Sequence, residues 1–550
     1  MLQIFCLNTQ RTHEVPEGST LEELLHQIAL DMPYGVTSAK VNNKVEGLHY
    51  RMFEPKTVQF LDVTSSSGLR TYTRSLFFVL YKAVHDLYPN VRLRIETPVS
   101  NGYYCRIEGN GPVTEAMVDA LRTRMAEIIK ADLPFRRTTT FTKDVATLFR
   151  ENGLDSKALL LDSYGELYTT YYTLDGLPNY FYGSLLLRTS QLYLFGLEPY
   201  AEGLLLRQPD SASPNRLLPM SDQSKMFAVF REQHHRQAIL GVNTVGDLNR
   251  AFAKGFANDL IHVSEALHEK QIGQLADRIV ADPKLRVILI AGPSSSGKTT
   301  FSKRLGVQLM ANGARPIPIS LDDYFVNRTD TPKDANGDYD FEHVEAVNIP
   351  LFNEQMNALL AGEEVVLPRY NFQTGESERQ ETSIRIGPND LIVLEGIHAL
   401  NPALTAQIPA EAKFKIYASA LTTLMIDDHN YIPTTDNRLL RRIVRDHKYR
   451  GYSAQETIRR WPSVRAGENR WIFPFQEEAD YMLNTALLFE LAVLRAQALP
   501  LLEQVPKNCD EYSEAYRLRR FLEYVHPISL DAVPPTSLLR EFLGGSTFTY

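Results

Sequence analysis

In the second half of the chain, short apolar runs alternate with segments whose apolar residues recur every three or four positions. The runs Val287–Ala291 and Asp390–Glu395 are short and almost uniformly apolar, as expected of strands buried on both faces. Between them, Phe301, Leu305 and Leu309 recur every four residues and predict one apolar face of a helix. Alternating strands and helices of this kind are typical of a doubly wound α/β sheet.

The front of the chain shows a different pattern, with a two-residue period and one short helix. Apolar and polar residues alternate over positions 2–6, which predicts a hairpin strand. Thr20 and Glu23 have the spacing of a capping box and predict a helix over residues 21–28. Further strands are expected at residues 39–45, around an Asn-Asn turn, and at residues 58–63. Strands packed on one helix predict a small β-grasp domain.

Changes in these patterns divide the chain into five expected segments. The segment after the β-grasp combines helices with hairpin-like strands and predicts an α+β domain. Three helices follow, expected at residues 226–237, 247–260 and 261–280. The end of the chain shows only a turn and a short helix, with no chemistry that we can assign. The expected segments are 1–63 (β-grasp), 64–220 (α+β), 221–282 (helical connector), 283–505 (α/β domain with a phosphate-binding loop) and 506–550 (C-terminal extension).

The composition is that of a globular protein made of several domains. Of the 550 residues, 44% are hydrophobic and 23% are charged. The net charge of −8 argues against a uniformly basic surface that binds nucleic acid, but it does not exclude a local basic patch. The three cysteines lie far apart, which favours a reducing compartment such as the cytoplasm over a disulfide framework. No apolar stretch approaches the length of a membrane span, so no membrane is expected among the partners.

The most specific motif follows the apolar run at residues 287–291. Residues 292–299 read GPSSSGKT, the G-x-x-x-x-G-K-[ST] spacing of a phosphate-binding loop. Glycines let backbone N–H groups turn toward a triphosphate, and the following helix adds the positive end of its dipole. The alternative is a glycine-rich turn without chemistry, but a strand before it and a helix after it favour the phosphate site. The residues expected to bind the nucleotide are Gly292, Ser294, Ser295, Ser296, Gly297, Lys298, Thr299 and Thr300.

Acidic residues follow two other expected strands of the same domain. Ligands of such sheets bind at the carboxyl ends of the strands, so Lys298, Asp322 and Glu395 should gather around one nucleotide. Lys298 can reach the terminal phosphates, and the Thr299 hydroxyl with the Glu395 carboxylate is expected to hold Mg²⁺. Asp322 or Asp323 is expected to take the proton from an attacking hydroxyl.

Arginines gather on a further expected helix. Arg438, Arg442 and Arg445 share one face, and Arg450 follows soon after. Guanidinium groups can stabilise the charge that spreads over a phosphoryl group during transfer while they exclude water. A solvated basic face is the alternative interpretation. The phosphate-binding loop favours the former, because it supplies the anion.

Five segments follow the loop in a fixed order: SLDDYF, YDFEHVEA, LPRYNF, VLEGIHAL and NRLLRRIVRDHKYRG. Together with the loop they resemble the uridine kinase/phosphoribulokinase branch of P-loop kinases, over about residues 285–500. The resemblance implies ATP- and Mg²⁺-dependent transfer of the γ-phosphate to the 5′-hydroxyl of a nucleoside such as uridine or cytidine. It also implies residue roles: Asp322 as the general base, Glu342 on the ribose hydroxyls of the acceptor, Tyr370 and Phe372 around the nucleoside, and Arg442, Arg445 and Arg450 in a lid.

The chain departs from that family pattern in two places. Uridine kinases carry a base-reading histidine shortly after the segment that reads LPRYNF here, and this chain has Gln373-Thr-Gly-Glu-Ser instead. The segment between residues 418 and 438 is also longer than in the simple family pattern. The base preference, and even the identity of the acceptor as a nucleoside, therefore stays open. The sequence also does not decide between ATP and GTP.

The front half resembles a second family. The segment VNNKVEGLHYRM resembles part of the TGS domain of threonyl-tRNA synthetases, and the order helix, DLYP, strand, NGYY, helix resembles their editing-associated domain. That domain builds a metal site from a His-x-x-x-His pair on its first helix, whose positions are Arg74 and Phe78 here. Neither side chain ligates zinc, so hydrolytic editing should be absent. The resemblance implies a scaffold or an RNA- or ligand-recognition role.

Two hypotheses from different classes follow. The first is an ATP-dependent kinase of a small hydroxyl acceptor, most simply a nucleoside. The second is a nucleotide-gated RNA- or ribosome-associated regulator, with the front half as the RNA-binding part. The tyrosines of residues 164–200 suit either RNA stacking or core packing, and we favour packing. The sequence leaves open whether the chain forms homo-oligomers.

Overall fold

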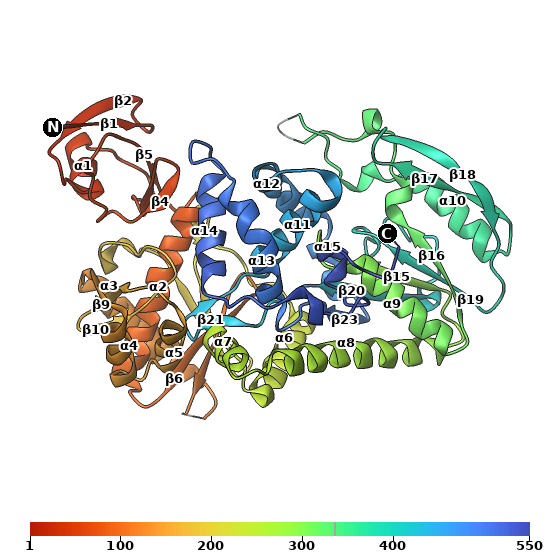
Figure 1. Ribbon diagram of the computed structural model, residues 1–550, viewed down its shortest axis with the longest axis horizontal. Helices are drawn as coiled ribbons and strands as arrows, with labels where there is room; N and C mark the ends of the chain where they lie inside the picture. Colours follow the sequence, from red (N-terminus) through yellow and green to blue (C-terminus); the bar gives the residue numbers. More distant parts are fainter. Residues whose placement is uncertain (110, 335–336, 550) are drawn as a thin grey trace.

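The computed structural model describes residues 1–109, 111–334 and 337–549. The first two segments lie at one end of an elongated molecule and the α/β domain at the other, with helix α8 running along the lower side of the α/β domain (Figure 1). The structure shows an α/β fold whose kinase-like half is preceded by two smaller units. Below, residues 1–63 are called the N-terminal unit, 64–220 the second unit and 283–505 the kinase unit.

The N-terminal unit is a mixed sheet with one helix, as expected of a β-grasp. The sheet has the order β2-β1-β5-β3-β4, with β1 antiparallel to β2 and parallel to β5. Thr20 and Glu23 form the expected capping box at the start of α1. Asn42 and Asn43 both have positive φ and form the tight turn between β3 and β4. The elements are β1 (Leu2–Cys6), β2 (Arg11–Val15), α1 (Leu21–Ile28), β3 (Ser38–Val41), β4 (Lys44–Glu46) and β5 (Lys56–Leu61).

The second unit packs its helices against two antiparallel sheets. One sheet has the order β11-β12-β7-β6 and the other β10-β9-β8, and β13 pairs with β14 beside them. The long helix α2 is buried along most of its length and supplies much of the core of this unit. Its elements are α2 (Ser66–Leu87), β6 (Arg92–Val99), β7 (Gly102–Glu108), α3 (Glu115–Lys130), β8 (Phe135–Phe141), α4 (Thr142–Glu151), α5 (Asp155–Ser163), β9 (Tyr168–Leu174), β10 (Leu177–Asn179), β11 (Gly196–Tyr200), β12 (Gly203–Arg207), β13 (Pro209–Asp210) and β14 (Ser213–Leu217).

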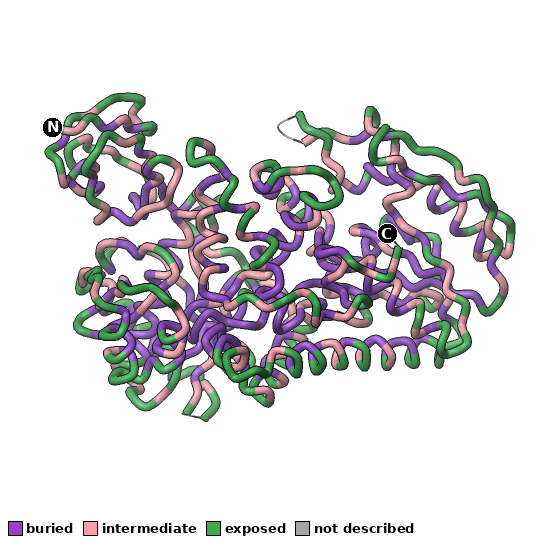
Figure 2. Tube along the Cα trace, viewed as in Figure 1, coloured by how far each residue is buried: buried purple, intermediate pink, exposed green. Residues whose placement is uncertain are grey.

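The connector consists of α6 (Ser224–Leu240), α7 (Val245–Ala253) and α8 (Ala257–Val280). The expected break between Leu260 and Ile261 was wrong, because the chain turns at Gly255, whose φ is +86°, and α8 continues through both residues. Figure 2 shows buried and exposed residues alternating along α8. Its buried face packs under the sheet of the kinase unit, with Ile272, Leu275 and Ile279 in the same cluster as Phe301.

The kinase unit is built on a parallel sheet of order β16-β19-β15-β20-β23. Alternate residues of β15 enter cores on opposite faces, Val287 and Leu289 on one and Ile288 and Ile290 on the other. Pro316 and Pro318 are tolerated because β16 is an edge strand and not a central one. The elements are β15 (Val287–Ala291), α9 (Lys298–Ala311), β16 (Arg315–Ser320), α10 (Ile349–Leu360), β17 (Val365–Asn371), β18 (Glu376–Ile384), β19 (Asp390–Glu395), β20 (Lys413–Ser419), β21 (Met425–Asp427), β22 (Asn430–Tyr431), α11 (Thr434–Arg450), α12 (Ala454–Trp471), β23 (Tyr481–Asn484) and α13 (Glu490–Glu503).

The C-terminal extension, residues 506–550, packs into the molecule over the part that the structure describes, which ends at residue 549. It contains α14 (Tyr512–Glu523) and α15 (Arg540–Leu543). Leu518, Phe521 and Leu522 share one buried cluster with residues of α11, α12 and α13. Tyr180 and Tyr182 of the second unit donate or accept hydrogen bonds at α14, through Tyr524 and the Arg517 carbonyl, so these tyrosines pack as expected.

The longer segment that departs from the kinase family pattern joins the two halves of the molecule. It contains the β21–β22 hairpin, which inserts among α5, β6 and β10 of the second unit. Asp428 accepts two hydrogen bonds of 2.9 Å from the Arg92 guanidinium. Asp427 forms an ion pair with Lys157 at 2.6 Å, and the two side chains are 0% and 1% exposed. None of the described helices is long and apolar enough to cross a membrane.

The buried pair should matter for stability because removing one member leaves an uncompensated charge in the interior. We expect Lys157→Met to lower the free energy of unfolding by about 3–5 kcal/mol. The matched control is Arg231→Met, which breaks the exposed ion pair with Glu202 (2.6 Å; side chains 61% and 58% exposed) and should cost about 1 kcal/mol or less. Urea denaturation followed by circular dichroism measures both losses, and equal losses would contradict this account of the interface.

Candidate active site

The loop between β15 and α9 has the close backbone contacts that its glycines predict. A Cβ on Gly292 would lie 2.0 Å from the Ala418 carbonyl oxygen, so no other residue fits there. Gly297 has φ of +85° and leads directly into α9. The Lys298 amine donates to the Pro293 carbonyl at 3.2 Å, across the loop. The loop therefore has the shape of a phosphate cradle.

Three strands end beside this loop. Glu395 at the end of β19 lies in register with Ser320 of β16 and Ile290 of β15. The Thr299 hydroxyl donates to the Glu395 carboxylate at 3.2 Å. Asp322 follows β16 on a single 3₁₀ turn, Leu321–Tyr324, and its N–H donates to the Ser320 hydroxyl. The sheet thus brings Asp322 and Glu395 together at one edge, as expected from the strand order.

The ionisation of these carboxyl groups depends on burial and on the charges around them. Burial raises the pKa of Asp322, and Lys298, Arg450 and Arg445 counteract that rise. Burial also raises the pKa of Glu395 to about 7, against the attraction of Lys298 and with the repulsion of Asp322. Lys298 therefore influences both carboxyl groups.

The expected acceptor residues lie around the same centre. Glu342 packs so closely on α12 that a Cβ on Gly467 would lie 2.3 Å from the Glu342 Cβ. Burial raises the pKa of Glu342 to about 7, while Arg442 opposes the rise. Tyr370 is buried and its ring lies 5.0 Å from that of Phe372, but Phe372 is 56% exposed at the tip of the β17–β18 hairpin. The Phe372 ring is therefore largely open to solvent and does not cover the expected nucleoside site.

The arginines of α11 divide into two groups. Arg442, Arg445 and Arg450 surround Asp446, at 3.2, 2.8 and 3.4 Å. Although burial opposes it, these guanidinium groups hold the pKa of Asp446 below its ordinary value. Arg442 also donates to the Ser294 hydroxyl of the loop at 2.7 Å. Three of the arginines are thus held together beside the phosphate cradle.

Arg438 has a different position, in the interior. It forms an ion pair with Glu468 of α12, and both side chains are almost fully buried. Its Nε donates to the Ser294 carbonyl at 2.9 Å, and Glu468 accepts from the Ser294 N–H at 3.0 Å. The Arg438–Glu468 pair therefore holds the loop at both the carbonyl and the N–H of Ser294. Sequence reasoning missed Glu468, because a single acid within a helix belongs to no motif.

The C-terminal extension reaches the same loop. The Glu541 carboxylate accepts hydrogen bonds from the Thr300 N–H at 3.1 Å and the Thr300 hydroxyl at 2.8 Å. Leu538 packs against the loop so that a Cβ on Gly297 would lie 2.1 Å from its Cδ2. A carboxylate here occupies the place of an anion at the start of α9. Sequence reasoning assigned no chemistry to the extension and did not single out Glu541.

The donors present fit a magnesium nucleotide. Hydroxyl and carboxylate oxygens are the ligands that Mg²⁺ prefers, and Thr299 and Glu395 supply one of each. Among the described residues no group of three or more His, Cys, Asp and Glu side chains gathers as a ready metal site. This agrees with the ordinary chemistry of Mg²⁺ in nucleotide sites, where phosphate and water complete the coordination.

Comparison with known proteins gives two kinds of relative. The model of the phosphoribulokinase / uridine kinase family matches residues 287–487. A uridine kinase of Lactobacillus helveticus is 30% identical over 199 residues, which are 36% of this chain and 85% of that kinase. A uridine kinase of Halobacterium salinarum is 29% identical over 35% of this chain and 77% of its own length.

The front of the chain is similar to a different enzyme. The threonine–tRNA ligase of Symbiobacterium thermophilum is 28% identical over 153 residues, which are 28% of this chain. The match spans only 24% of the ligase, about a quarter of its length. With the loop, the strand ends and the arginine cluster in place, these similarities assign the chain to the phosphoribulokinase / uridine kinase family, joined to an N-terminal part that is similar to threonine–tRNA ligases.

Proposed function

We propose that the protein is a nucleoside kinase that transfers the γ-phosphate of ATP to the 5′-hydroxyl of a nucleoside of the uridine or cytidine type. The observation that supports this most is the meeting of Lys298, Asp322 and Glu395 beside the phosphate cradle. The kinase domain would be residues 283–505, preceded by a TGS-like domain, an editing-like domain without metal ligands and the connector. A cytoplasmic location agrees with three dispersed cysteines.

In this proposal each residue has a physical task. The loop N–H groups and Lys298 orient the phosphates, and Asp322 takes the proton from the acceptor hydroxyl. Thr299 and Glu395 would hold Mg²⁺, which neutralises charge on the phosphates when bound. Arg442, Arg445 and Arg450 leave Asp446 in part to contact the phosphoryl group in transfer, and Glu342 accepts hydrogen bonds from the ribose.

Replacing the proposed base tests the mechanism directly. Asp322→Asn keeps the shape of the side chain but cannot accept the proton, so we expect kcat to fall about 10²–10⁴-fold while ATP binding persists. Asp323→Asn is the matched control, because Asp323 accepts the Tyr370 N–H at 3.4 Å and serves the pocket wall. Single-turnover transfer of labelled phosphate to uridine measures both, and full activity of Asp322→Asn would assign the base elsewhere.

The pH dependence of acceptor binding tests the role of Glu342. Its pKa near 7 means that the carboxyl is mostly ionised at pH 8 and mostly protonated at pH 6. Only the ionised form accepts hydrogen bonds from two ribose hydroxyls, so at saturating MgATP the KM for the nucleoside should rise about tenfold from pH 8 to pH 6. Glu342→Gln should show a high KM that does not change with pH. A wild-type KM that is constant over this range would contradict the role.

The proposed reaction also requires Glu541 to leave Thr300, because the nucleotide phosphates need the same N–H groups. Glu541→Gln weakens the competing hydrogen bonds by removing their charge, and we expect the KM for ATP to fall about tenfold. Glu503→Gln, an exposed acid at the end of α13, is the control and should leave the KM unchanged. Steady-state kinetics at saturating nucleoside measure the effect. An unchanged or higher KM in Glu541→Gln would mean that the extension does not compete with ATP.

The second candidate is a nucleotide-gated regulator that binds RNA through its front half. The similarity of that half to threonine–tRNA ligases supports it. This function predicts that RNA is retained on the protein in an ATP-dependent way and that no acceptor is phosphorylated. Filter binding of RNA with and without ATP, beside the kinase assay, separates the two candidates.

A further inference from the structure

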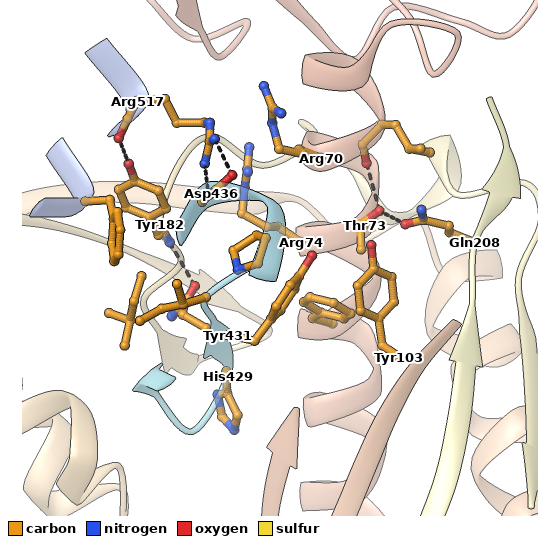
Figure 3. A pocket seen from close by; sticks show the side chains of 17 residues that line it. Arg70, Thr73, Arg74, Tyr103, Tyr182, Gln208, His429, Tyr431, Asp436 and Arg517 are labelled. Atoms are coloured by element: carbon orange, nitrogen blue, oxygen red, sulfur yellow. Dashed lines mark hydrogen bonds and ion pairs between the residues drawn. The ribbon is translucent and has the colours of Figure 1, made fainter. Parts of the chain in front are cut away.

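A large cavity lies away from the phosphate cradle. It has a volume of about 640 Å³ and is enclosed by three parts of the chain: the loop after β4, the second unit, and helix α14 of the C-terminal extension. A smaller cavity of about 110 Å³ lies deeper and shares Arg70, Arg74, Tyr182 and Arg517 with it (Figure 3). The combined space falls within the range of small-molecule sites, which is about 300–1,000 Å³.

The cavity is strongly basic. One acidic side chain lines it, Glu46, and this residue already forms an ion pair with Lys44 at 2.6 Å. Facing it are seven cationic residues. They are Lys44, Arg51, Arg70, Arg74, Arg137, Arg517 and Arg520. Lys44, Arg70, Arg517 and Arg520 are paired with carboxylates, so the attraction for an anionic ligand comes mainly from the other three cations.

Three of these arginines lack a carboxylate partner among the residues that the structure describes. Arg74 donates to the Ser184 carbonyl at 3.0 Å, Arg51 to the Gly18 carbonyl at 2.8 Å, and Arg137 to the Thr170 hydroxyl at 3.3 Å. Arg51 and Arg137 are exposed, and Arg74 is half-buried. Guanidinium groups bind carboxylates and phosphates readily, and none of these three is already committed to a carboxylate.

Burial and neighbouring cations both act on the ionisation of the wall. Burial lowers the pKa of Arg74 to about 10, with a smaller contribution from Arg70. Burial and, to a smaller extent, the nearby Arg137 lower the pKa of His49 to about 4. A bound anion would oppose the part of each shift that comes from a neighbouring cation.

Aromatic side chains form the rest of the wall. Tyr50, Phe53, Tyr172, Tyr516 and Tyr524 come from the same three parts of the chain. Phe53 is 62% exposed, so its ring is accessible. Rings of this kind stack on nucleobases, while arginines bind the phosphates.

We propose that this cavity binds a free nucleotide, with the phosphates on Arg51, Arg74 and Arg137 and the base against the tyrosines of the wall. A free nucleotide is favoured over an RNA chain because the space is bounded and ends at the β21–β22 hairpin and α11. The Arg74 guanidinium lies against Gly183, where a Cβ would be 2.7 Å from the Arg74 Cζ.

The cavity also contacts the helix that carries the arginine cluster. Arg517 forms a bidentate ion pair with Asp436, at 2.6 and 2.7 Å. Asp436 lies in the first turn of α11, and Arg445 and Arg450 lie in its last turns. A phosphate that draws Arg517 away from Asp436 would therefore act on the helix of the active site.

The test is calorimetric titration of the full chain carrying Lys298→Ala, which weakens the phosphate cradle and leaves the cavity intact. The probes are ATP, GTP and UTP, each added separately. We expect one of them to bind with a stoichiometry of one. Adding Arg137→Ala should raise the dissociation constant about tenfold or more.

A matched control lies next to Arg137 on the same strand. Arg136 pairs with Thr173 and points to the opposite face of β8, whereas Arg137 pairs with Tyr172 of the cavity wall. Arg136→Ala should change the dissociation constant less than about twofold, since a distant surface charge contributes little in physiological salt.

Three results would overturn the proposal: no nucleotide binds to the Lys298→Ala protein, both arginine variants weaken binding equally, or a short single-stranded RNA binds while free nucleotides do not. The last result would make the cavity an RNA site. Acceptor-dependent ADP release by Arg136→Ala alone, in the wild-type background, is measured in parallel and should equal that of the wild type. A failure of the kinase proposal therefore leaves the binding result intact, and the reverse also holds.

Discussion

The start of helix α9 sets the electrostatic constraint on which the active site depends. Its free N–H groups and the positive end of its dipole require negative charge opposite them. In this chain the Glu541 carboxylate provides it at the Thr300 N–H, and Glu468 accepts from the Ser294 N–H in the loop before the helix. Both acids lie more than 150 residues after the loop, so the phosphate cradle ties α12 and α15 to the centre of the kinase unit.

The same constraint orders the surrounding cations. Arg438 is buried with Glu468, which neutralises it. Arg441 pairs with Glu490, while Arg442, Arg445 and Arg450 converge on Asp446. Burying any of these charges without its partner would cost several kcal/mol, roughly 3–5 for a broken buried pair. The arrangement therefore keeps several guanidinium groups beside the cradle. An incoming phosphate can bind them in place of a carboxylate, so no charge is left unpaired.

Local signals allowed much of the fold and the centre of the site to be predicted. The capping box fixed α1, and the glycine spacing fixed the loop, because each depends on neighbouring residues only. Asp322 and Glu395 were found because the ends of parallel strands meet at one edge. Glu541 was not found, because nothing in the surrounding sequence distinguishes it from the other 65 Asp and Glu residues of the chain.

Long-range pairing decided the remaining features. The extra segment at residues 418–438 was visible as a departure from the family pattern, but its place between the two halves depends on Lys157 and Arg92, hundreds of residues away. The basic cavity likewise draws its arginines from four separated stretches of sequence, each of which is unremarkable alone. These charges can act together on a ligand only when folding brings them to one wall of the cavity.

The central claim is that the centre beside the cradle phosphorylates a nucleoside, and the most direct measurement is ADP release from MgATP with a panel of nucleosides and sugar alcohols. The account predicts release that depends on a pyrimidine nucleoside, with the phosphate recovered on its 5′-oxygen. Release that no nucleoside or sugar alcohol increases would contradict it.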